Sequence, residues 1–215
     1  TGELTRHVRT PTAEVPDGDA LVAWVAQQVR AWGLIPAALG ISAGGPLDDV
    51  AGKIVSWPRM EHLWGYPLAD KLKAAIPSLM AVKLVNDASA ACAGEAVFGA
   101  ARGLKRSIYL TISTGVGGGA VVGGLLLRGE RGNAAEFGHT IVAPDGPVCD
   151  CGQQGCLEAV SSGSGLYRRA VEAGLVNADE MGWAQMGYWL AERLEQKDPA
   201  ALALWTGFIM IMILL

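Results

Sequence analysis

Three of the four cysteines crowd into one short glycine-rich segment, and a histidine precedes them. The segment reads Cys149-Asp150-Cys151-Gly152-Gln153-Gln154-Gly155-Cys156, and His139 lies shortly before it. Three thiolates and one imidazole complete the tetrahedral coordination of a zinc ion. Plain buried thiols are the less favoured alternative, because cysteines rarely pack so densely in one turn without a metal. We therefore predict a structural zinc site formed by His139, Cys149, Cys151 and Cys156, closed to water and not hydrolytic.

A second candidate site is the turn after a predicted apolar strand over residues 107–112. The turn reads Ser113-Thr114-Gly115-Val116-Gly117-Gly118-Gly119. Backbone N–H groups and hydroxyls in such a turn can bind phosphate oxygens. A plain β-turn is an equal alternative, because hairpins often contain glycine clusters and this one matches neither the Walker A nor the Rossmann pattern.

Carboxylates stand at two further places where chemistry is expected. Asn86 and Asp87 end an apolar strand, where α/β enzymes commonly carry catalytic groups, and the pair could equally cap the helix that follows. Glu136 and Glu158 flank the predicted metal ligands. They could hold hydroxyl groups of a ligand or form salt bridges, and the residues alone favour salt bridges.

The elements that must position these residues alternate between strands and helices. Strands are predicted at 4–8, 38–41, 53–55, 82–85 and 107–112, with a hairpin over 119–127 that turns at Gly123-Gly124. Helices are predicted from Asp17 or Asp19 to about residue 32, and over 68–76, 88–98, 165–173 and 183–197. This alternation predicts an α/β protein. No linker-like composition is present, so we expect two domains, 1–86 and 87–215, that meet at a hinge near Asn86-Asp87.

Composition excludes several classes of protein. With 215 residues, 51% hydrophobic and 18% charged, the chain is not of a disordered type. A net charge of −4 means that the chain has no excess of basic residues to attract nucleic acid or an anionic membrane. The apolar run 204–215 is shorter than the roughly 20 residues that a membrane span needs. It is therefore expected to be either a buried element or a damaged end of the sequence. Clustered cysteines and the lack of a signal-peptide core predict a cytoplasmic protein without membrane or nucleic-acid partners.

Taken in chain order, these motifs resemble the ROK family of bacterial sugar kinases and sugar-responsive repressors. The resemblance runs from about Gly40 to Arg169. It includes Val85-Asn86-Asp87-Ala88, the glycine turn, Glu136-Phe137-Gly138-His139 and, most specifically, the pattern Cys-x-Cys-Gly-x-x-Gly-Cys-x-Glu that ends at Glu158. The resemblance implies an actin-like ATPase fold, in which two α/β domains are separated by a cleft.

The same resemblance implies an ATP-dependent hexose kinase, a phosphotransferase with an alcohol as acceptor. Asp87 would be the general base for the sugar hydroxyl that attacks the γ-phosphate. His139 would bind zinc through one ring nitrogen and the sugar through the other. The other implied sugar-binding residues are Asn86, Glu136 and Glu158, and the implied phosphate contacts are Thr114, Gly115 and Gly117, with Mg²⁺ accompanying ATP. Glucose is the first expected substrate, N-acetylhexosamines stay open, and a homodimer or homotetramer is expected.

Two alternative functions belong to other classes. The chain could be the sugar-sensing domain of a ROK-type transcriptional repressor, or a zinc-stabilised α/β binding domain without catalysis. Residues upstream of Thr1 would separate kinase from repressor: an Asp-x-Gly-Gly-Thr strand and turn indicates a kinase, and a basic helical domain indicates a regulator.

We predict negligible kinase activity for these 215 residues alone. The family's Asp-x-Gly-Gly-Thr phosphate segment and its C-terminal glycine-rich adenosine motif are both absent here. Thr1-Gly2-Glu3-Leu4 resembles the sequence just after the former, and 206–215 does not continue the family pattern. We therefore expect incomplete ends and half an ATP site. An ATP-dependent sugar phosphorylation assay checks this, and robust turnover by the 215 residues would contradict it.

Overall fold

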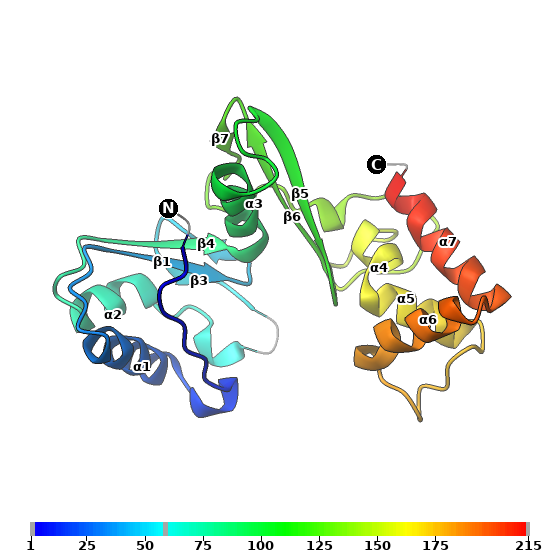
Figure 1. The fold of residues 1–215 in the computed structure, drawn as a ribbon, viewed down its shortest axis with the longest axis horizontal. Helices are drawn as coiled ribbons and strands as arrows, with labels where there is room; N and C mark the ends of the chain where they lie inside the picture. The colour runs from blue at the N-terminus through cyan, green and yellow to red at the C-terminus, as the bar shows by residue number, and fades with distance from the viewer. Residues whose placement is uncertain (1–2, 58–59, 214–215) are drawn as a thin grey trace. The chain divides into compact units, whose positions relative to one another are not determined.

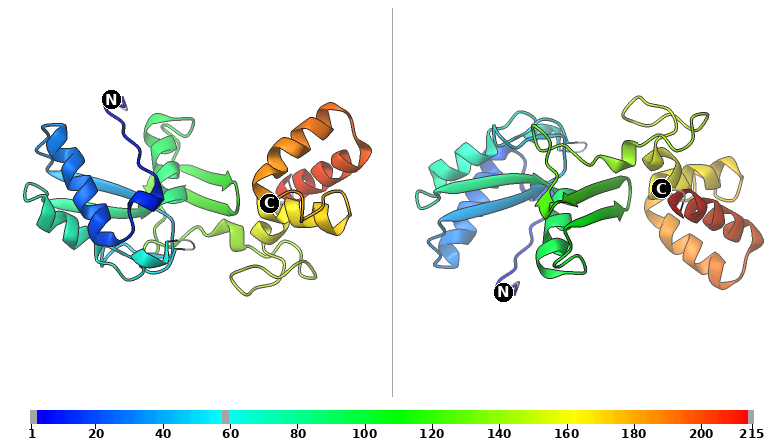
Figure 2. Two further views of the ribbon diagram at one scale, coloured as in Figure 1. Left: turned by 90° about the horizontal axis from the view of Figure 1, so that it is seen from below. Right: turned by 90° about the horizontal axis from the view of Figure 1, so that it is seen from above.

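The chain folds into two compact units, which are drawn in Figures 1 and 2. The computed structural model describes residues 3–57 and 60–213. The first unit comprises residues 1–109 and 119–135, and the second comprises residues 110–118 and 136–215. The sequence predicts that both ends of the chain are incomplete. Residues 1–2 and 214–215 at these ends lie outside the described residues. The domain boundary expected after residue 86 stays a prediction.

Two parallel strands form the centre of the first unit. Strand β1 (Ala38–Ala43) pairs with β4 (Ala81–Asn86) in a register that sets Ala43 opposite Asn86. Because the strands are parallel, their carboxyl ends meet at one edge, where polar groups can be brought together. At this edge a β-carbon added to Gly45, in the turn after β1, would lie 3.7 Å from the amide nitrogen of Asn86.

Two helices cover one face of this strand pair. Helices α1 (Gly18–Ala31) and α2 (Leu68–Ala75) lie on the same side of β1 and β4 (Figures 1 and 2). Apolar side chains from helices, strands and the connections between them form the core of this unit. The buried members are Val22, Ala26, Ala43, Leu47, Ile54, Leu63, Leu68, Leu72, Ile76, Leu79 and Leu84.

Capping and turn residues account for the start and end of α1. The Asp17 carboxylate accepts a hydrogen bond from the Ala20 N–H at 2.7 Å, and Gly33, with φ +64°, follows the helix end. The strand predicted over 4–8 is wrong: that stretch is irregular and Leu4 is 78% exposed. Alternation alone does not make a strand, because a strand needs a partner for its backbone groups. Short elements complete this region: the 3₁₀ helices η1 (Thr12–Glu14) and η2 (Glu61–Leu63), and the antiparallel strands β2 (Leu47–Asp48) and β3 (Lys53–Ile54).

A glycine-rich hairpin follows helix α3 (Asp87–Phe98). Its sheet has the order β5 (Arg106–Ile112), β6 (Val116–Val122), β7 (Leu125–Leu126). The β6–β7 turn is the predicted one, and positive φ angles at Gly123 and Gly124 suit a tight hairpin. A β-carbon on Gly119 would lie 2.5 Å from that of Cys92, so only glycine lets β6 approach α3 this closely.

The segment after β7 is bound to strand β2 (Leu47–Asp48) and to the residue that follows it. The Asn133 side chain forms two hydrogen bonds with the backbone of Leu47, at 2.8 and 2.7 Å. Arg128 forms an ion pair with the buried carboxylate of Asp49. Ala135, at the end of this segment, has φ +66°, a left-handed conformation that is unfavourable for any residue with a β-carbon.

Helices dominate the second unit. Their core packs apolar side chains of α5, α6 and α7, among them Leu166, Ala170, Met186, Leu190, Leu204 and Phe208. Leu204 and Phe208 are buried, so the beginning of the apolar run 204–215 is a buried helix, one of the two predicted alternatives. None of the helices in the described ranges combines the length and hydropathy of a bilayer span. The helices are α4 (Leu157–Ser161), α5 (Gly163–Glu172), α6 (Met186–Glu195) and α7 (Pro199–Ile213), with η3 (Phe137–His139) and η4 (Trp183–Gln185).

Replacing Ala135 by glycine should stabilise the protein. Left-handed backbone costs an alanine about 1–2 kcal/mol, and the extra chain entropy of glycine returns roughly half of that. We expect the free energy of unfolding in denaturant to rise by about 0.5–1 kcal/mol for Ala135→Gly. The matched variant Ala134→Gly, at a neighbour without positive φ, should lower it by a similar amount. Equal losses in both variants would contradict strain at Ala135.

Candidate metal centre and phosphate turn

A tight glycine-containing loop brings the cysteines together. The Gly152 N–H donates to the Cys149 carbonyl at 2.8 Å, and the Cys149 N–H donates to the Gln153 carbonyl at 2.8 Å. Gly152 and Gly155 have φ angles of +88° and +76°, which reverse the chain within this short span. The loop then enters α4 directly after Cys156.

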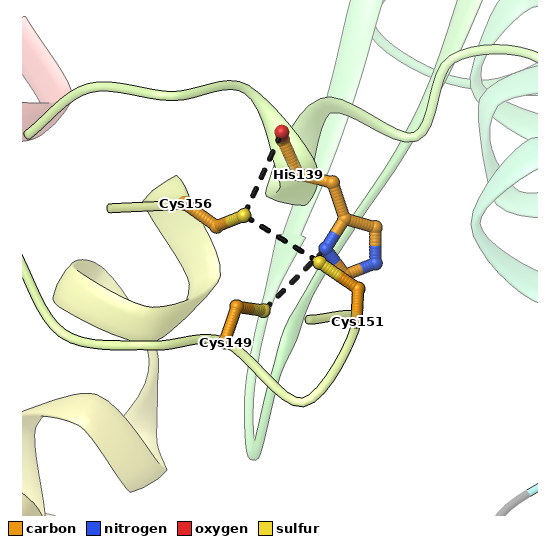
Figure 3. A group of neighbouring side chains, drawn as sticks. All are labelled: His139, Cys149, Cys151 and Cys156. Atoms are coloured by element: carbon orange, nitrogen blue, oxygen red, sulfur yellow. Dashed lines mark hydrogen bonds between the residues drawn. The ribbon is translucent and has the colours of Figure 1, made fainter. Parts of the chain in front are cut away.

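The side chains of His139, Cys149, Cys151 and Cys156 converge on one point (Figure 3). Their ligand atoms all lie within 4.8 Å of one another. The sulfurs of Cys151 and Cys156 are 3.6 Å apart, and Nδ1 of His139 is 3.6 Å from the Cys149 sulfur. Zinc–sulfur bonds of about 2.3 Å at tetrahedral angles set two sulfurs about 3.8 Å apart and a sulfur and an imidazole nitrogen about 3.6 Å apart. The four side chains therefore fit a tetrahedral zinc ion.

The orientation of the imidazole leaves one ring nitrogen outside the cluster. Nδ1 of His139 faces the Cys149 sulfur, and the other nitrogen, Nε2, points away from the three sulfurs (Figure 3). Bound zinc would fix the plane of this ring. Nε2 would then carry the ring proton and could donate it to a ligand oxygen.

Burial decides the protonation of two of the thiols. Burial, with a smaller effect from the thiols of Cys151 and Cys149, raises the pKa of Cys156 to about 12. Burial also raises the pKa of Cys149, whereas the Gln153 backbone N–H lowers the pKa of the exposed Cys151. Without a metal, Cys149 and Cys156 are therefore protonated at neutral pH. Metal binding must displace these protons, so the affinity for zinc falls as the pH falls.

Glu158 connects the cysteine cluster with the glycine turn. One of its carboxylate oxygens, Oε2, accepts a hydrogen bond from the Val116 N–H at 2.8 Å. The other, Oε1, lies 3.9 Å from the Cys149 sulfur. Glu158 thus binds a backbone N–H, not a basic side chain as the salt-bridge alternative expected. A carboxylate can accept several hydrogen bonds, so Oε1 can still take part in binding a hydroxyl group.

The glycine turn lies against the helices that follow the cysteines. Thr114 and Gly115 belong to the turn between β5 and β6, and Gly117 is the second residue of β6. A β-carbon on Gly115 would lie 2.3 Å from the Glu158 carboxylate, and one on Gly138 would lie 1.9 Å from the Val116 carbonyl oxygen. Gly138 therefore has no room for a side chain, because the clash is with backbone, whereas a side chain at Gly115 would have to displace the Glu158 carboxylate. Packing thus explains these glycines without reference to a ligand.

Asn86 and Asp87 lie at the junction of β4 and α3 in the first unit. The Asn86 side chain accepts from the Ser89 N–H at 3.1 Å, so Asn86 is the N-cap of α3, as one of the two predicted alternatives proposed. The Asp87 side chain is exposed, and its Oδ1 accepts from the Ala88 N–H at 2.8 Å. This hydrogen bond orients the Asp87 carboxylate.

The structure groups the predicted site residues by unit. The first unit contains Asn86 and Asp87. The second unit contains all the others: His139, the three cysteines, Glu136, Glu158, Thr114, Gly115 and Gly117. Sequence reasoning missed Gly163 and Ser164, which bind the glycine turn, and Ser162, which contacts the Ser164 hydroxyl. Their signal in the sequence is Ser161-Ser162-Gly163-Ser164, a run of helix-capping residues directly behind the cysteine segment.

Comparisons with known proteins show the family to which this chain belongs. The chain matches the ROK family over residues 2–210. A glucokinase of Thermotoga maritima is 43% identical over 130 residues, which are 60% of this chain and 40% of that protein. An N-acetylmannosamine kinase of Shigella boydii is 38% identical over 180 residues, which are 81% of this chain and 58% of that protein. The chain thus spans about half the length of the curated relatives it matches.

A solved structure extends the likeness to three dimensions. It is the crystal structure of a ROK family glucokinase from Streptomyces griseus in complex with glucose and AMPPNP. The match has a TM-score of 0.68 and 35% sequence identity, and covers 94% of this chain and 66% of that one.

The purified chain should contain about one zinc ion, bound by the four-ligand cluster. Cys151→Ser should lower the zinc content and speed amide hydrogen exchange across residues 136–158, because the loop loses its anchor. The matched control is Cys92→Ser, because Cys92 is a buried residue of α3 that lies outside the cluster. Elemental analysis and exchange mass spectrometry give both readouts. Wild-type protein without zinc, or equal zinc loss in both variants, would contradict the site.

Proposed function

The chain belongs to the ROK family. We propose that it forms part of an ATP-dependent hexose kinase. The reaction transfers the γ-phosphate of ATP to a sugar hydroxyl. Its α/β architecture is the actin-like ATPase fold, as predicted. The matched glucokinase and N-acetylmannosamine kinase support glucose and N-acetylhexosamines as the first sugars to test.

The observation that carries this proposal is the orientation of His139. Its Nδ1 faces the cysteine cluster and its Nε2 points away from it. Zinc, when bound, would hold the imidazole in one orientation and one tautomer, and would have no open position for a substrate. His139 would then donate from Nε2 to a sugar hydroxyl oxygen. Glu136, Glu158 and Asn86 complete the proposed set of sugar-binding residues.

We assign the general base to Asp87. Its exposed carboxylate is oriented by the Ala88 N–H at the start of α3. As the sugar oxygen attacks the γ-phosphorus, its proton passes to the Asp87 carboxylate. The new bond joins the sugar oxygen to phosphorus, the bond to the β–γ bridging oxygen breaks, and ADP leaves with the electron pair. A carboxylate is sufficient because it has to orient the hydroxyl and accept one proton.

We assign the phosphates of ATP, accompanied by Mg²⁺, to Thr114, Gly115 and Gly117. Backbone N–H groups of a glycine turn suit phosphate oxygens because they are compact, fixed donors. All four cysteines are free thiols, which supports a reducing, cytoplasmic compartment. Assembly as a homodimer or homotetramer stays a prediction.

Asp87→Ala should reduce kcat by about 10²- to 10⁴-fold, the usual effect of losing a general base, with KM for the sugar changed only a few-fold. The assay uses a longer chain that carries these residues behind an Asp-x-Gly-Gly-Thr segment, with glucose and N-acetylmannosamine as acceptors. Asp70→Asn, an exposed carboxylate in the first turn of α2, is the matched control and should retain kcat.

Two outcomes would contradict the proposal in different ways. An unchanged kcat in Asp87→Ala would remove the assigned base while leaving the kinase function in place. Tight sugar binding by the wild-type protein without phosphorylation would instead favour the sugar-sensing domain of a repressor.

A further inference from the structure

The start of the glycine turn is bound to the N-terminus of α5 through its carbonyl groups. The Ser113 carbonyl accepts from the Gly163 N–H at 2.7 Å. The Thr114 carbonyl accepts from the Ser164 N–H at 3.2 Å and from the Ser164 hydroxyl at 2.8 Å. A β-carbon on Gly163 would lie 2.7 Å from the Ser113 oxygen, so the contact is too close for any other residue. Two successive carbonyls of the turn are therefore held toward α5.

These contacts decide where the N–H groups of the turn point. In a trans peptide the C=O and the N–H of the next residue point in opposite directions. Holding the Ser113 carbonyl toward α5 turns the Thr114 N–H away from α5. Holding the Thr114 carbonyl in the same way turns the Gly115 N–H away. These two donors are among the three that the proposed function assigns to phosphate oxygens.

A pair of hydroxyls fixes the Ser164 side chain. The Ser162 oxygen accepts from the Gly165 N–H at 3.0 Å and lies 3.0 Å from the Ser164 oxygen. The Ser164 hydroxyl has one proton, which goes to the Thr114 carbonyl, so Ser162 must be the donor between the two hydroxyls. The resulting chain runs from buried Ser162 through Ser164 to the turn, and each bond polarises the next.

We propose that Ser164 is a positioning residue for nucleotide binding. It does not touch the phosphates: it orients the Thr114–Gly115 peptide so that its N–H faces the side on which phosphate would bind. This inference rests on the proposed function, because it takes the glycine turn as the phosphate contact. It goes beyond it by assigning a role to a residue of α5.

The test compares three serine variants in these 215 residues or in a longer chain that contains them, whichever phosphorylates a hexose. Ser164→Ala removes one of the two hydrogen bonds on the Thr114 carbonyl and should raise KM for MgATP by about five-fold, as expected for one net hydrogen bond. KM for the sugar should stay at the wild-type value. Ser164→Thr keeps the hydroxyl and should restore KM for MgATP.

Ser161→Ala is the matched control. The Ser161 hydroxyl is buried and has no hydrogen-bond partner among the described residues, so it forms no hydrogen bond with the turn. This variant should leave both KM values unchanged. Amide hydrogen exchange gives a readout without turnover: residues 113–116 should exchange faster in Ser164→Ala, with α5 as protected as in the wild type.

The possible failures can be told apart. If the wild-type protein phosphorylates a hexose and Ser164→Ala keeps the wild-type KM for MgATP, the inference is wrong and the proposed function stands. If Ser164→Ala and Ser161→Ala raise both KM values alike, the effect is general loosening and the inference is again wrong. If no form of the protein binds MgATP, the proposed function fails and the inference falls with it.

Discussion

The convergence of three thiols and one imidazole is the constraint on which the second unit depends. Four ligand atoms within 4.8 Å of one another require η3, the cysteine loop and the start of α4 to meet at one point. Because α4 begins directly after Cys156, the position of the cluster also fixes Glu158, whose carboxylate holds the Val116 N–H. The loop that gathers the ligands therefore also determines where the glycine turn lies.

Two separate physical reasons explain why glycine occurs at these positions of the second unit. Gly152 and Gly155 adopt positive φ angles that let the cysteine loop reverse direction. Gly115, Gly138 and Gly163 lie where a β-carbon would overlap a neighbouring atom. Packing alone thus requires glycine at several positions of a motif that resembles a ligand-binding one. The glycine content by itself therefore does not indicate phosphate binding, and the direction of the Thr114 and Gly115 N–H groups is the stronger support for it.

Several local predictions agree with the structure because local chemistry controls them. Asp17 caps α1, Gly123-Gly124 turns the β6–β7 hairpin, and the four residues predicted to bind zinc lie together. The strand predicted over 4–8 is wrong because pairing, which residues 3–8 lack in the structure, is not encoded in alternation. The salt-bridge expectation for Glu158 is replaced by a backbone hydrogen bond, because its partner comes from a turn distant in the chain.

The residues alone determined the four candidate metal ligands, the α/β class and the position of the glycine turn, since spacing and residue type carry that information. Tertiary packing alone decided which ring nitrogen of His139 faces the sulfurs, and that Ser164 and Glu158 hold the turn. These contacts join residues far apart in sequence, and their directions follow from how helix and turn pack. No spacing rule contains that information.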